Sequence, residues 1–386
     1  MRNLFFELLQ LALGTRQTLS FTPSEKEWID AFDVSKKQAL VGICFKGVQQ
    51  ACRLDGDAAK NLPVQLKMQW LALTANIQKR NEVMNLRCAE LYGKIKADGY
   101  ESCVLKGQAV AKLYDKEHEA FGQLRQSGDI DMWMLADADT AIRWAKETDM
   151  MYYFDYHHAD LSLFPDAEIE LHYRPSISRN LWRNHRLQRW FKDEGMKHIT
   201  HDEELGFCVP DEVFSLMLTL NHNLWHLLYE GVGLRQMMDL YFVAKAMYSS
   251  EETTSLIHYF GLERFAAASA WVLWHLFDNE SEQSFLISSI SPLPCPDECA
   301  GRFLLHEIML AGNFGHSDDR LSGLVKRNRI VLMCRWMRHT MRLVRYYPQE
   351  VMWTPFGILR ISLWRRWYAR KYWRTRQTLW SRPCRC

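Results

Sequence analysis

The chain has 386 residues, of which 48% are hydrophobic and 13% aromatic, ample for one large or two medium domains with a packed core. Its formal net charge is only +2, but residues 326–386 contain sixteen Lys or Arg residues and a single acid, Glu350. The acidic residues are therefore concentrated in the rest of the chain. No run of eighteen apolar residues occurs, so no transmembrane helix is expected.

The ten cysteines show no pattern of a disulfide framework. The close pairs Cys295/Cys299 and Cys384/Cys386 lack a matching second pair or a suitably spaced histidine, so a zinc site is not expected there. Free thiols indicate a reducing compartment, and we expect a cytoplasmic protein. The apolar residues 1–14 are interrupted by polar ones and lack a cleavage site, which favours an amphipathic helix over a signal peptide.

Residues 1–98 are expected to form an N-terminal helical region. Its first clear helix begins with a predicted capping box, in which Thr22 is the N-cap, Pro23 the first helical residue and Glu25 the third. Gly99 is a helix-stop glycine. The helices between these points are predicted over residues 35–53 and 65–97.

The pattern then changes to a compact mixed α/β module over residues 99–176. Strands are predicted near residues 104–105, 129–135, 151–156, 159–164 and 168–174, with helices at 108–114 and 138–148. Residues 177–320 are expected to form a helical domain that packs on this module. Its helices are predicted over 181–192, 210–229, 234–248, 251–275 and 299–311, with a proline-rich connector at 279–298. The basic, aromatic-rich region 321–386 adds helices near 325–346 and 355–380.

Two acids stand two residues apart on a predicted strand. Asp129 and Asp131 therefore point to the same face, because side chains alternate along a strand. At about 4 Å and an effective dielectric of about 20, two such charges repel by roughly 4 kcal/mol. Mg²⁺, which prefers oxygen ligands and substrate phosphates, would compensate them. The alternative is a solvated pair at a strand edge.

A third carboxylate is available on the strand at 168–174. Glu168, Glu170 and His172 share one face of it, and the register favours Glu170 over Glu168. A third acid beside the pair suits a two-metal centre for phosphoryl transfer. His172 could contact a phosphate or orient Glu170, or it could be structural.

Residues near these acids are candidates for binding phosphate. Lys106 and Gly107 lie at a strand-to-helix turn, where backbone N–H groups favour anions. The alternative for Lys106 is an ordinary surface lysine. Arg125 and Ser127 directly precede the acidic strand and could also reach a phosphate.

Several of these segments together resemble an uncharacterised bacterial nucleotidyltransferase family of the DNA polymerase beta-like superfamily. The resemblance lies in Leu105-Lys106-Gly107-Gln108-Ala109, Leu124-Arg125, Gly128-Asp129-Ile130-Asp131, Glu170-Leu171-His172-Tyr173-Arg174 and the helical segment from Leu220 to Leu240. It covers about residues 30–245. The superfamily's usual Gly-Gly or Gly-Ser turn lies about ten residues before the paired acids, whereas Lys106-Gly107 lies twenty-two before Asp129.

The resemblance implies an α+β fold, a small mixed-sheet nucleotidyltransferase core embedded in a mostly helical chain. It also implies a Mg-dependent enzyme that moves a nucleoside monophosphate from a nucleoside triphosphate, ATP by analogy, to an unknown acceptor hydroxyl. The residues that it implies for metal binding and catalysis are Asp129, Asp131 and Glu170, with two Mg²⁺ ions. For the nucleotide it implies Lys106, Gly107, Arg125, Ser127 and Gly128.

Two features outside the acids have competing interpretations. His222 and His226 share a helical face, as do Arg235 and Asp239, and packing is favoured over chemistry for both pairs. The basic, aromatic tail within residues 326–386 could bind nucleic acid or an anionic membrane surface, or it could pack on the acidic remainder. The alternative function is thus a non-catalytic adaptor that binds through this tail.

Overall fold

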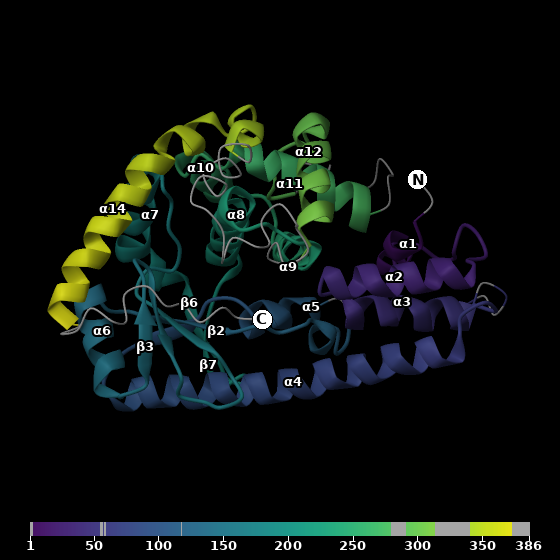
Figure 1. The fold of residues 1–386 in the computed structure, drawn as a ribbon, viewed down its shortest axis with the longest axis horizontal. Coiled ribbons are helices and arrows are strands. Elements are labelled where there is room, and N and C mark those ends of the chain that lie inside the picture. Colours follow the sequence, from purple (N-terminus) through teal and green to yellow (C-terminus); the bar gives the residue numbers. More distant parts are fainter. Residues whose placement is uncertain are drawn as a thin grey trace, which may run out of the picture. The chain divides into compact units, whose positions relative to one another are not determined.

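The computed structural model describes residues 3–54, 57, 59–116, 118–278, 291–312 and 340–372 (Figure 1). They form two compact units. Unit 1 comprises Met1–Val83, Val110–Ser127 and Tyr229–Asp319, and unit 2 comprises Met84–Ala109, Gly128–Leu228 and Arg320–Cys386. Most of the helix predicted at 325–346 and the end of the tail lie outside the described residues. A mixed sheet embedded in a mostly helical chain confirms the predicted α+β class.

Unit 1 is helical in its described part. Helix α1 packs on α3 in the N-terminal region, and α11 packs on α12. Buried aromatic residues such as Trp28, Trp70 and Phe242 fill the interior. The helices that lie wholly in unit 1 are α1 (Leu4–Ala12), α2 (Glu25–Lys37), α3 (Val41–Leu54), α9 (Leu234–Lys245), α10 (Glu251–Tyr259), α11 (Glu263–Phe277) and α12 (Glu298–Ala311), and the short 3-10 helix is η1 (Gly122–Leu124).

Helix α2 begins two residues later than the predicted capping box. The N-cap is Ser24, whose side chain accepts a hydrogen bond from Glu27 N while the Glu27 carboxylate accepts one from Ser24 N at 2.7 Å. The prediction of Thr22 as N-cap is therefore wrong. The Ser24 start places both Glu25 and Glu27 in the first turn, where carboxylates interact favourably with the helix dipole.

The helix predicted over residues 251–275 is interrupted. Gly261 has a φ of 63°, in the left-handed region that favours glycine. Its N–H donates to His258 O, and Leu262 N–H donates to Ile257 O, both at 2.9 Å. This pair of bonds is a Schellman motif, which ends α10 and lets α11 start in a new direction.

Unit 2 contains a five-stranded sheet with the order β1-β2-β5-β4-β3. The β2–β5 pair is parallel, and the other neighbours are antiparallel. The strands are shorter than predicted by one to three residues at several ends, within the usual uncertainty of strand limits. Their bounds are β1 (Ser102–Val104), β2 (Ile130–Met134), β3 (Met151–Phe154), β4 (His158–Leu161) and β5 (Ile169–His172).

Strand β2 is buried along its whole length because both sheet faces are covered. Ile130, Met132 and Met134 belong to a core cluster with residues of α4 (Val64–Ala97) and α6 (Ala138–Glu147). Trp133 points to the other face, where its ring stacks on Phe214 at 5.7 Å between centroids. Asp131 also lies on this second face. Strand β2 therefore contributes apolar side chains to the core on one face and a carboxylate to the other.

The second face is completed by α7 (Leu181–Asp193) and α8 (Glu212–Tyr229), which supply Phe191 and Phe214. Between them lie a 3-10 turn, η2 (Gly195–His198), and a hairpin that the sequence did not predict. Its strands are β6 (Ile199–Asp202) and β7 (Phe207–Pro210), which pair antiparallel. The predicted helices at 181–192 and 210–229 are confirmed as α7 and α8.

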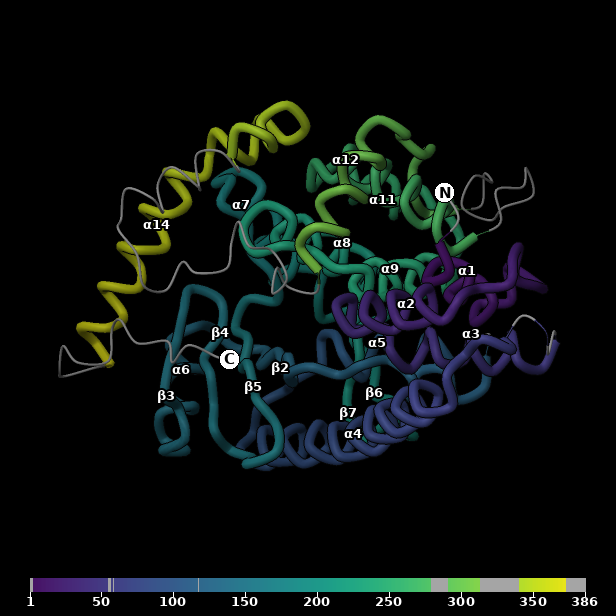
Figure 2. Tube along the Cα trace, turned by 45° about the vertical axis from the view of Figure 1, so that its right-hand side comes forward, coloured from purple at the N-terminus to yellow at the C-terminus, as the bar shows by residue number. Residues whose placement is uncertain are grey.

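Helix α14 (Pro348–Tyr372) runs along unit 2 from the neighbourhood of α7 to that of α6 (Figure 2). At its C-terminal end Tyr372 donates a hydrogen bond to Asp139, near the start of α6. Near its start Glu350 forms a buried ion pair with Arg183 of α7 at 3.0 Å. None of the helices in the described part of the chain is long and apolar enough to cross a membrane.

Candidate functional site

Three carboxylates lie side by side across the middle of the unit 2 sheet. In the parallel pair β2–β5, Asp131 is opposite Glu170, and in the antiparallel pair β4–β5, Glu170 is opposite Asp160. Residues directly opposite in neighbouring strands point to the same face. Asp131, Glu170 and Asp160 therefore form a row on one face of the sheet.

Asp129 joins this row from the segment that leads into β2. It precedes Asp131 by two residues and is half-buried. Burial, followed by the negative charges of Asp131 and Glu170, raises the pKa of Asp129 to about 7. The two acids whose charges raise the pKa of Asp129 are therefore the two that the sequence placed with it in one predicted metal site. Glu168, the competing candidate, is exposed and precedes the first residue of β5.

Lys106 reaches the acids from the turn after β1. Its Nζ lies 2.9 Å from Asp131 Oδ1, and the lysine side chain is only 16% exposed, which excludes an ordinary surface lysine. The turn depends on Gly107, whose φ is 59°. A Cβ built on Gly107 would lie 3.8 Å from the Asp129 carbonyl oxygen, so this turn packs against the start of the acidic segment.

His172 links two of the carboxylates. Its Nε2 lies 2.9 Å from Asp131 Oδ1 and 3.4 Å from Glu170 Oε2. Burial alone would lower the pKa of His172, but these two carboxylates raise it to about 9. In the same way Lys106 and His172 outweigh the burial of Asp131 and hold the pKa of its carboxyl below the ordinary value.

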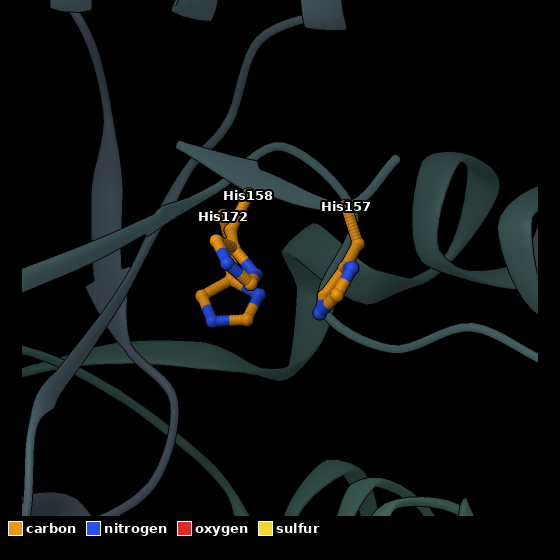
Figure 3. Close-up of side chains that lie close together, drawn as sticks. All are labelled: His157, His158 and His172. Atoms are coloured by element: carbon orange, nitrogen blue, oxygen red, sulfur yellow. The ribbon is translucent and has the colours of Figure 1, made fainter. Parts of the chain in front are cut away.

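A second group of side chains on β4 extends the site. His158 is 2% exposed, and its Nε2 lies 2.9 Å from Asp160 Oδ1 while its Nδ1 lies 3.4 Å from Glu170 Oε2. Its neighbour His157 has its ring centroid 4.2 Å from that of His158. Figure 3 shows the rings of His158 and His172 next to each other, with His157 approaching them from the side.

The donor set fits a bound metal ion. Asp131, Glu170 and His172 each offer a ligand atom, and these atoms lie within 4.8 Å of one another. Carboxylate oxygens are the ligands that Mg²⁺ prefers. Burial and the charges of Asp131 and Glu170 raise the pKa of Asp129, so the charged form of this carboxyl lacks a compensating positive charge. A divalent cation would supply that compensation.

Two residues predicted to contact the nucleotide belong to unit 1. Arg125 is 4% exposed, and its guanidinium donates two hydrogen bonds to Asp239, from Nε at 2.7 Å and Nη2 at 2.9 Å. Asp239 also accepts a hydrogen bond from the Tyr114 hydroxyl at 2.7 Å. Arg125 is thus part of a buried ion pair, and its contact with a phosphate stays a prediction, as does that of Ser127. Gly128 is exposed in unit 2, next to Asp129.

The two histidines of α8 contact each other, and His222 also contacts Lys106. His226 Nε2 lies 2.7 Å from His222 Nε2, and Lys106 Nζ lies 3.2 Å from the same His222 atom. Burial, followed by the charge of Lys106, lowers the pKa of His222 well below its ordinary value. A neutral imidazole can accept a hydrogen bond from Lys106, so His222 positions the lysine beside Asp131.

The site also contains His157, His158 and Asp160, which the sequence pattern did not indicate. The strand was predicted to begin at Ala159, which left out His158, although His158 and Asp160 have the same spacing of two as Glu170 and His172. Reading this alternation from residue 158 would have placed both side chains on the face that presents the acids.

Comparisons with known proteins agree with this geometry. A family model described as "Uncharacterised nucleotidyltransferase" matches residues 24–278, about two thirds of the chain. Searches of curated proteins and of solved structures gave no match. The matched range includes the Lys106 turn, all four carboxylates and both helices α8 and α9. The chain therefore belongs to this uncharacterised nucleotidyltransferase family.

Proposed function

We propose that the site on the unit 2 sheet transfers a nucleoside monophosphate from a nucleoside triphosphate to an acceptor hydroxyl and releases pyrophosphate. The observation that carries this proposal is the register of β2 with β5, which sets Glu170 directly opposite Asp131, two residues after Asp129. This register brings the carboxylates of Asp131 and Glu170 together on one face, and Asp129 adds a third from the segment just before β2. Phosphoryl transfer through bound metal ions requires such a concentrated set of negative ligands.

Asp129, Asp131 and Glu170 would hold the metal. Magnesium bound there would neutralise the charge that develops on the phosphates during transfer. Glu170 is suited to a ligand role because His158 and His172 hold its pKa well below the ordinary value despite burial, which keeps the carboxylate ionised. Lys106, already beside Asp131, would face the phosphate oxygens and attract the triphosphate.

The chain's own residues would contribute mainly by position. The sheet fixes Asp131 and Glu170, and His172 and Lys106 hold the Asp131 carboxylate from two sides. The acceptor hydroxyl would lose its proton to a carboxylate of this group as its oxygen attacks the α-phosphorus, and pyrophosphate would leave from the opposite side. Preorganised charge of this kind supplies most of the catalysis in phosphoryl transfer.

The transfer can be tested with α-labelled nucleoside triphosphates and Mg²⁺. The full chain should release pyrophosphate and retain label on an acceptor, while Asp129→Asn and Asp131→Asn should each lower the rate at least a hundredfold. Glu168→Gln is the matched control, because it removes an exposed carboxylate just before β5 of the same sheet and should leave the rate unchanged. If the Asp129→Asn and Asp131→Asn variants behave like wild type, these acids do not perform the chemistry.

A second candidate function concerns the outward face of α14. Five apolar side chains form a stripe along it and are each at least half exposed: Met352, Phe356, Leu359, Leu363 and Trp367. Successive members are three or four residues apart, so they lie on one face of the helix. The exposed Arg366 and Arg370 continue this face at its C-terminal end. An apolar stripe next to basic residues fits an anionic membrane surface.

Nucleic acid fits this helix less well. Stacking on bases needs exposed aromatic rings, but Tyr368 and Tyr372 are buried and Trp364 packs against the core cluster of unit 2. Trp367 is the exposed aromatic in this part of the helix. The predicted contacts of residues 373–386 fall outside the described residues.

Co-sedimentation with vesicles tests the membrane surface. The full chain should bind vesicles rich in phosphatidylserine, and binding should weaken with salt and on removal of the stripe in Phe356→Ser/Leu363→Ser. Met352→Leu is the matched control, since it keeps the apolar surface. Equal binding to neutral vesicles, or binding to single-stranded nucleic acid that is lost in the same double variant, would contradict the proposal.

A further inference from the structure

Three imidazoles lie together beside the carboxylate row. His157, His158 and His172 each offer a ring nitrogen, and these nitrogens lie within 4.8 Å of one another (Figure 3). His158 and His172 are opposite residues on β4 and β5, so their side chains share a face. Both of these histidines are only 2% exposed.

The outer nitrogens of two rings have fixed neighbours. Asp160 Oδ1 lies 2.9 Å from His158 Nε2, and the backbone oxygen of Arg174 lies 3.4 Å from His172 Nδ1. Metal-binding histidines usually hydrogen-bond a carboxylate or backbone carbonyl through one nitrogen, as His172 Nδ1 does here, which directs the other nitrogen to the ion. Neither ring nitrogen of His158 has a hydrogen-bond partner among the residues that the structure describes. In this chain the nitrogens that remain for an ion are His158 Nδ1 and His172 Nε2, and His172 Nε2 would exchange its 2.9 Å contact with Asp131 Oδ1 for the ion.

These two nitrogens face the same atom. Glu170 Oε2 lies 3.4 Å from each of them. Ligands bound at about 2.0–2.1 Å to a tetrahedral ion are about 3.3 Å apart, so this spacing is that of neighbouring ligands on one ion. The third nitrogen is His157 Nδ1, which, like His158 Nδ1, is buried without a hydrogen-bond partner among the residues that the structure describes.

From this arrangement we propose that His157, His158 and His172, with Glu170 as the fourth ligand, form a second site for a Zn²⁺-like ion next to the acidic site, with which it shares Glu170. Nitrogen-rich sites favour Zn²⁺ and Co²⁺, whereas Mg²⁺ prefers oxygen ligands. Four protein ligands close the coordination shell, so this ion has a structural role.

The ion would stabilise the site of transfer. It ties β4 to β5 through His158 and His172 and fixes Glu170 in its place opposite Asp131. Glu170 would then be shared, with one carboxylate bridging the nitrogen-rich site and the acidic site. The four carboxylates Asp129, Asp131, Asp160 and Glu170 would gain a second fixed positive charge beside that of Lys106.

The test uses Co²⁺ as a spectroscopic probe in the full chain, without nucleotide. The chain, freed of metal by a chelator, should bind one equivalent of Co²⁺ and develop the intense visible bands of a four-coordinate site. His157→Ala and His158→Gln should each weaken binding at least tenfold. His185→Ala is the matched control, because it removes an exposed histidine on α7 and should bind Co²⁺ like wild type.

The readouts separate this site from the acidic one. Asp129→Asn should keep the Co²⁺ spectrum even if it abolishes nucleotide transfer, so the two proposals can fail independently. Circular dichroism checks folding, and if His158→Gln does not fold, the half-buried His157→Ala decides the question. The proposal is overturned if wild type shows only the weak bands of an octahedral oxygen site, or if folded His157→Ala binds Co²⁺ as tightly as wild type.

Discussion

Lys106 and Asp131 form an ion pair in the interior of unit 2, with Nζ and Oδ1 2.9 Å apart and the two side chains 16% and 7% exposed. The lysine comes from the turn after β1 and the aspartate from β2, two neighbouring strands. An ammonium group therefore occupies a position beside the carboxylate row, where it partly compensates a charge that a metal ion would also compensate.

Replacing Lys106 should show two effects, the loss of a buried ion pair and the removal of a cation that competes with the metal ion. In Lys106→Met the chain should lose about 1–3 kcal/mol of unfolding free energy without metal, because the Asp131 charge loses a buried partner. Mg²⁺ should restore more stability to this variant than it adds to wild type, since the acids then attract the ion without competition. Urea unfolding with and without Mg²⁺ measures both differences.

Lys94→Met provides the comparison for that experiment. Lys94 pairs with Asp98 at 3.5 Å on an exposed face of α4, where both side chains are 42% exposed. Such pairs contribute little to stability, so this variant should stay close to wild type with and without Mg²⁺. If Mg²⁺ raises the unfolding free energy of Lys106→Met and Lys94→Met by the same amount, Lys106 does not compete with a metal ion for the acids.

A different ion pair stabilises unit 1. Asp239 is 8% exposed and accepts two hydrogen bonds from Arg125 and one from Tyr114, so replacing it removes the carboxylate that pairs with this buried guanidinium. Asp239→Asn should lower the unfolding free energy by about 3–5 kcal/mol, the cost of a broken buried pair. Asp33→Asn, which removes an exposed pair with Lys36, should cost less than about 1 kcal/mol. A destabilisation of the same size in both variants contradicts this account.

The same pair predicts how stability depends on pH. Burial would raise the pKa of Asp239, but Arg125 outweighs it and holds the pKa below the ordinary value. A carboxyl with a depressed folded-state pKa contributes stability above its unfolded pKa of about 3.9, and this contribution is lost as pH falls through the folded value. The stability difference between wild type and Asp239→Asn should thus be constant near neutral pH and shrink below about pH 4. If the stability difference between wild type and Asp239→Asn grows as the pH falls, the prediction is wrong.

The core of the site could be predicted because it depends on short-range patterns. Alternation along a strand places Asp129 and Asp131 on one face, and the same rule applied to residues 168–174 selects Glu170 with His172. The long helix α4, its end at Gly99 and the helix α5 (Gln108–Tyr114) follow equally from local signals. A feature could not be predicted where the sequence is compatible with more than one local structure.

Other features depend on partners far apart in the chain. The pairing of Arg125 with Asp239 joins residues 114 positions apart, so no local pattern indicates it. The hairpin β6–β7 was missed because its strands have only four residues each and β6, Ile-Thr-His-Asp, contains a single apolar side chain. The two possible N-caps, Thr22 and Ser24, satisfy the same capping pattern, and only the folded helix distinguishes them.

Two tryptophans of α14, three residues apart, should behave differently. Trp364 packs edge-on against Tyr156 at 5.3 Å between centroids and lies under the Arg174 guanidinium, whereas Trp367 is 58% exposed. Trp364→Ala should therefore lower the unfolding free energy by about 3 kcal/mol, and Trp367→Ala by less than about 1 kcal/mol. Thermal unfolding of the two variants compares them directly. Equal losses would mean that α14 is not docked by its Trp364 face.

The central claim is that Glu170 completes a metal site with Asp129 and Asp131. Titration of Mn²⁺, followed by electron paramagnetic resonance in the presence of a nucleoside triphosphate, measures ion binding at this site without any knowledge of the acceptor. Glu170→Gln should weaken Mn²⁺ binding at least tenfold, and Glu168→Gln, two residues earlier, should leave it unchanged. If both variants bind Mn²⁺ as tightly as wild type, Glu170 is not a ligand and the proposed site is wrong.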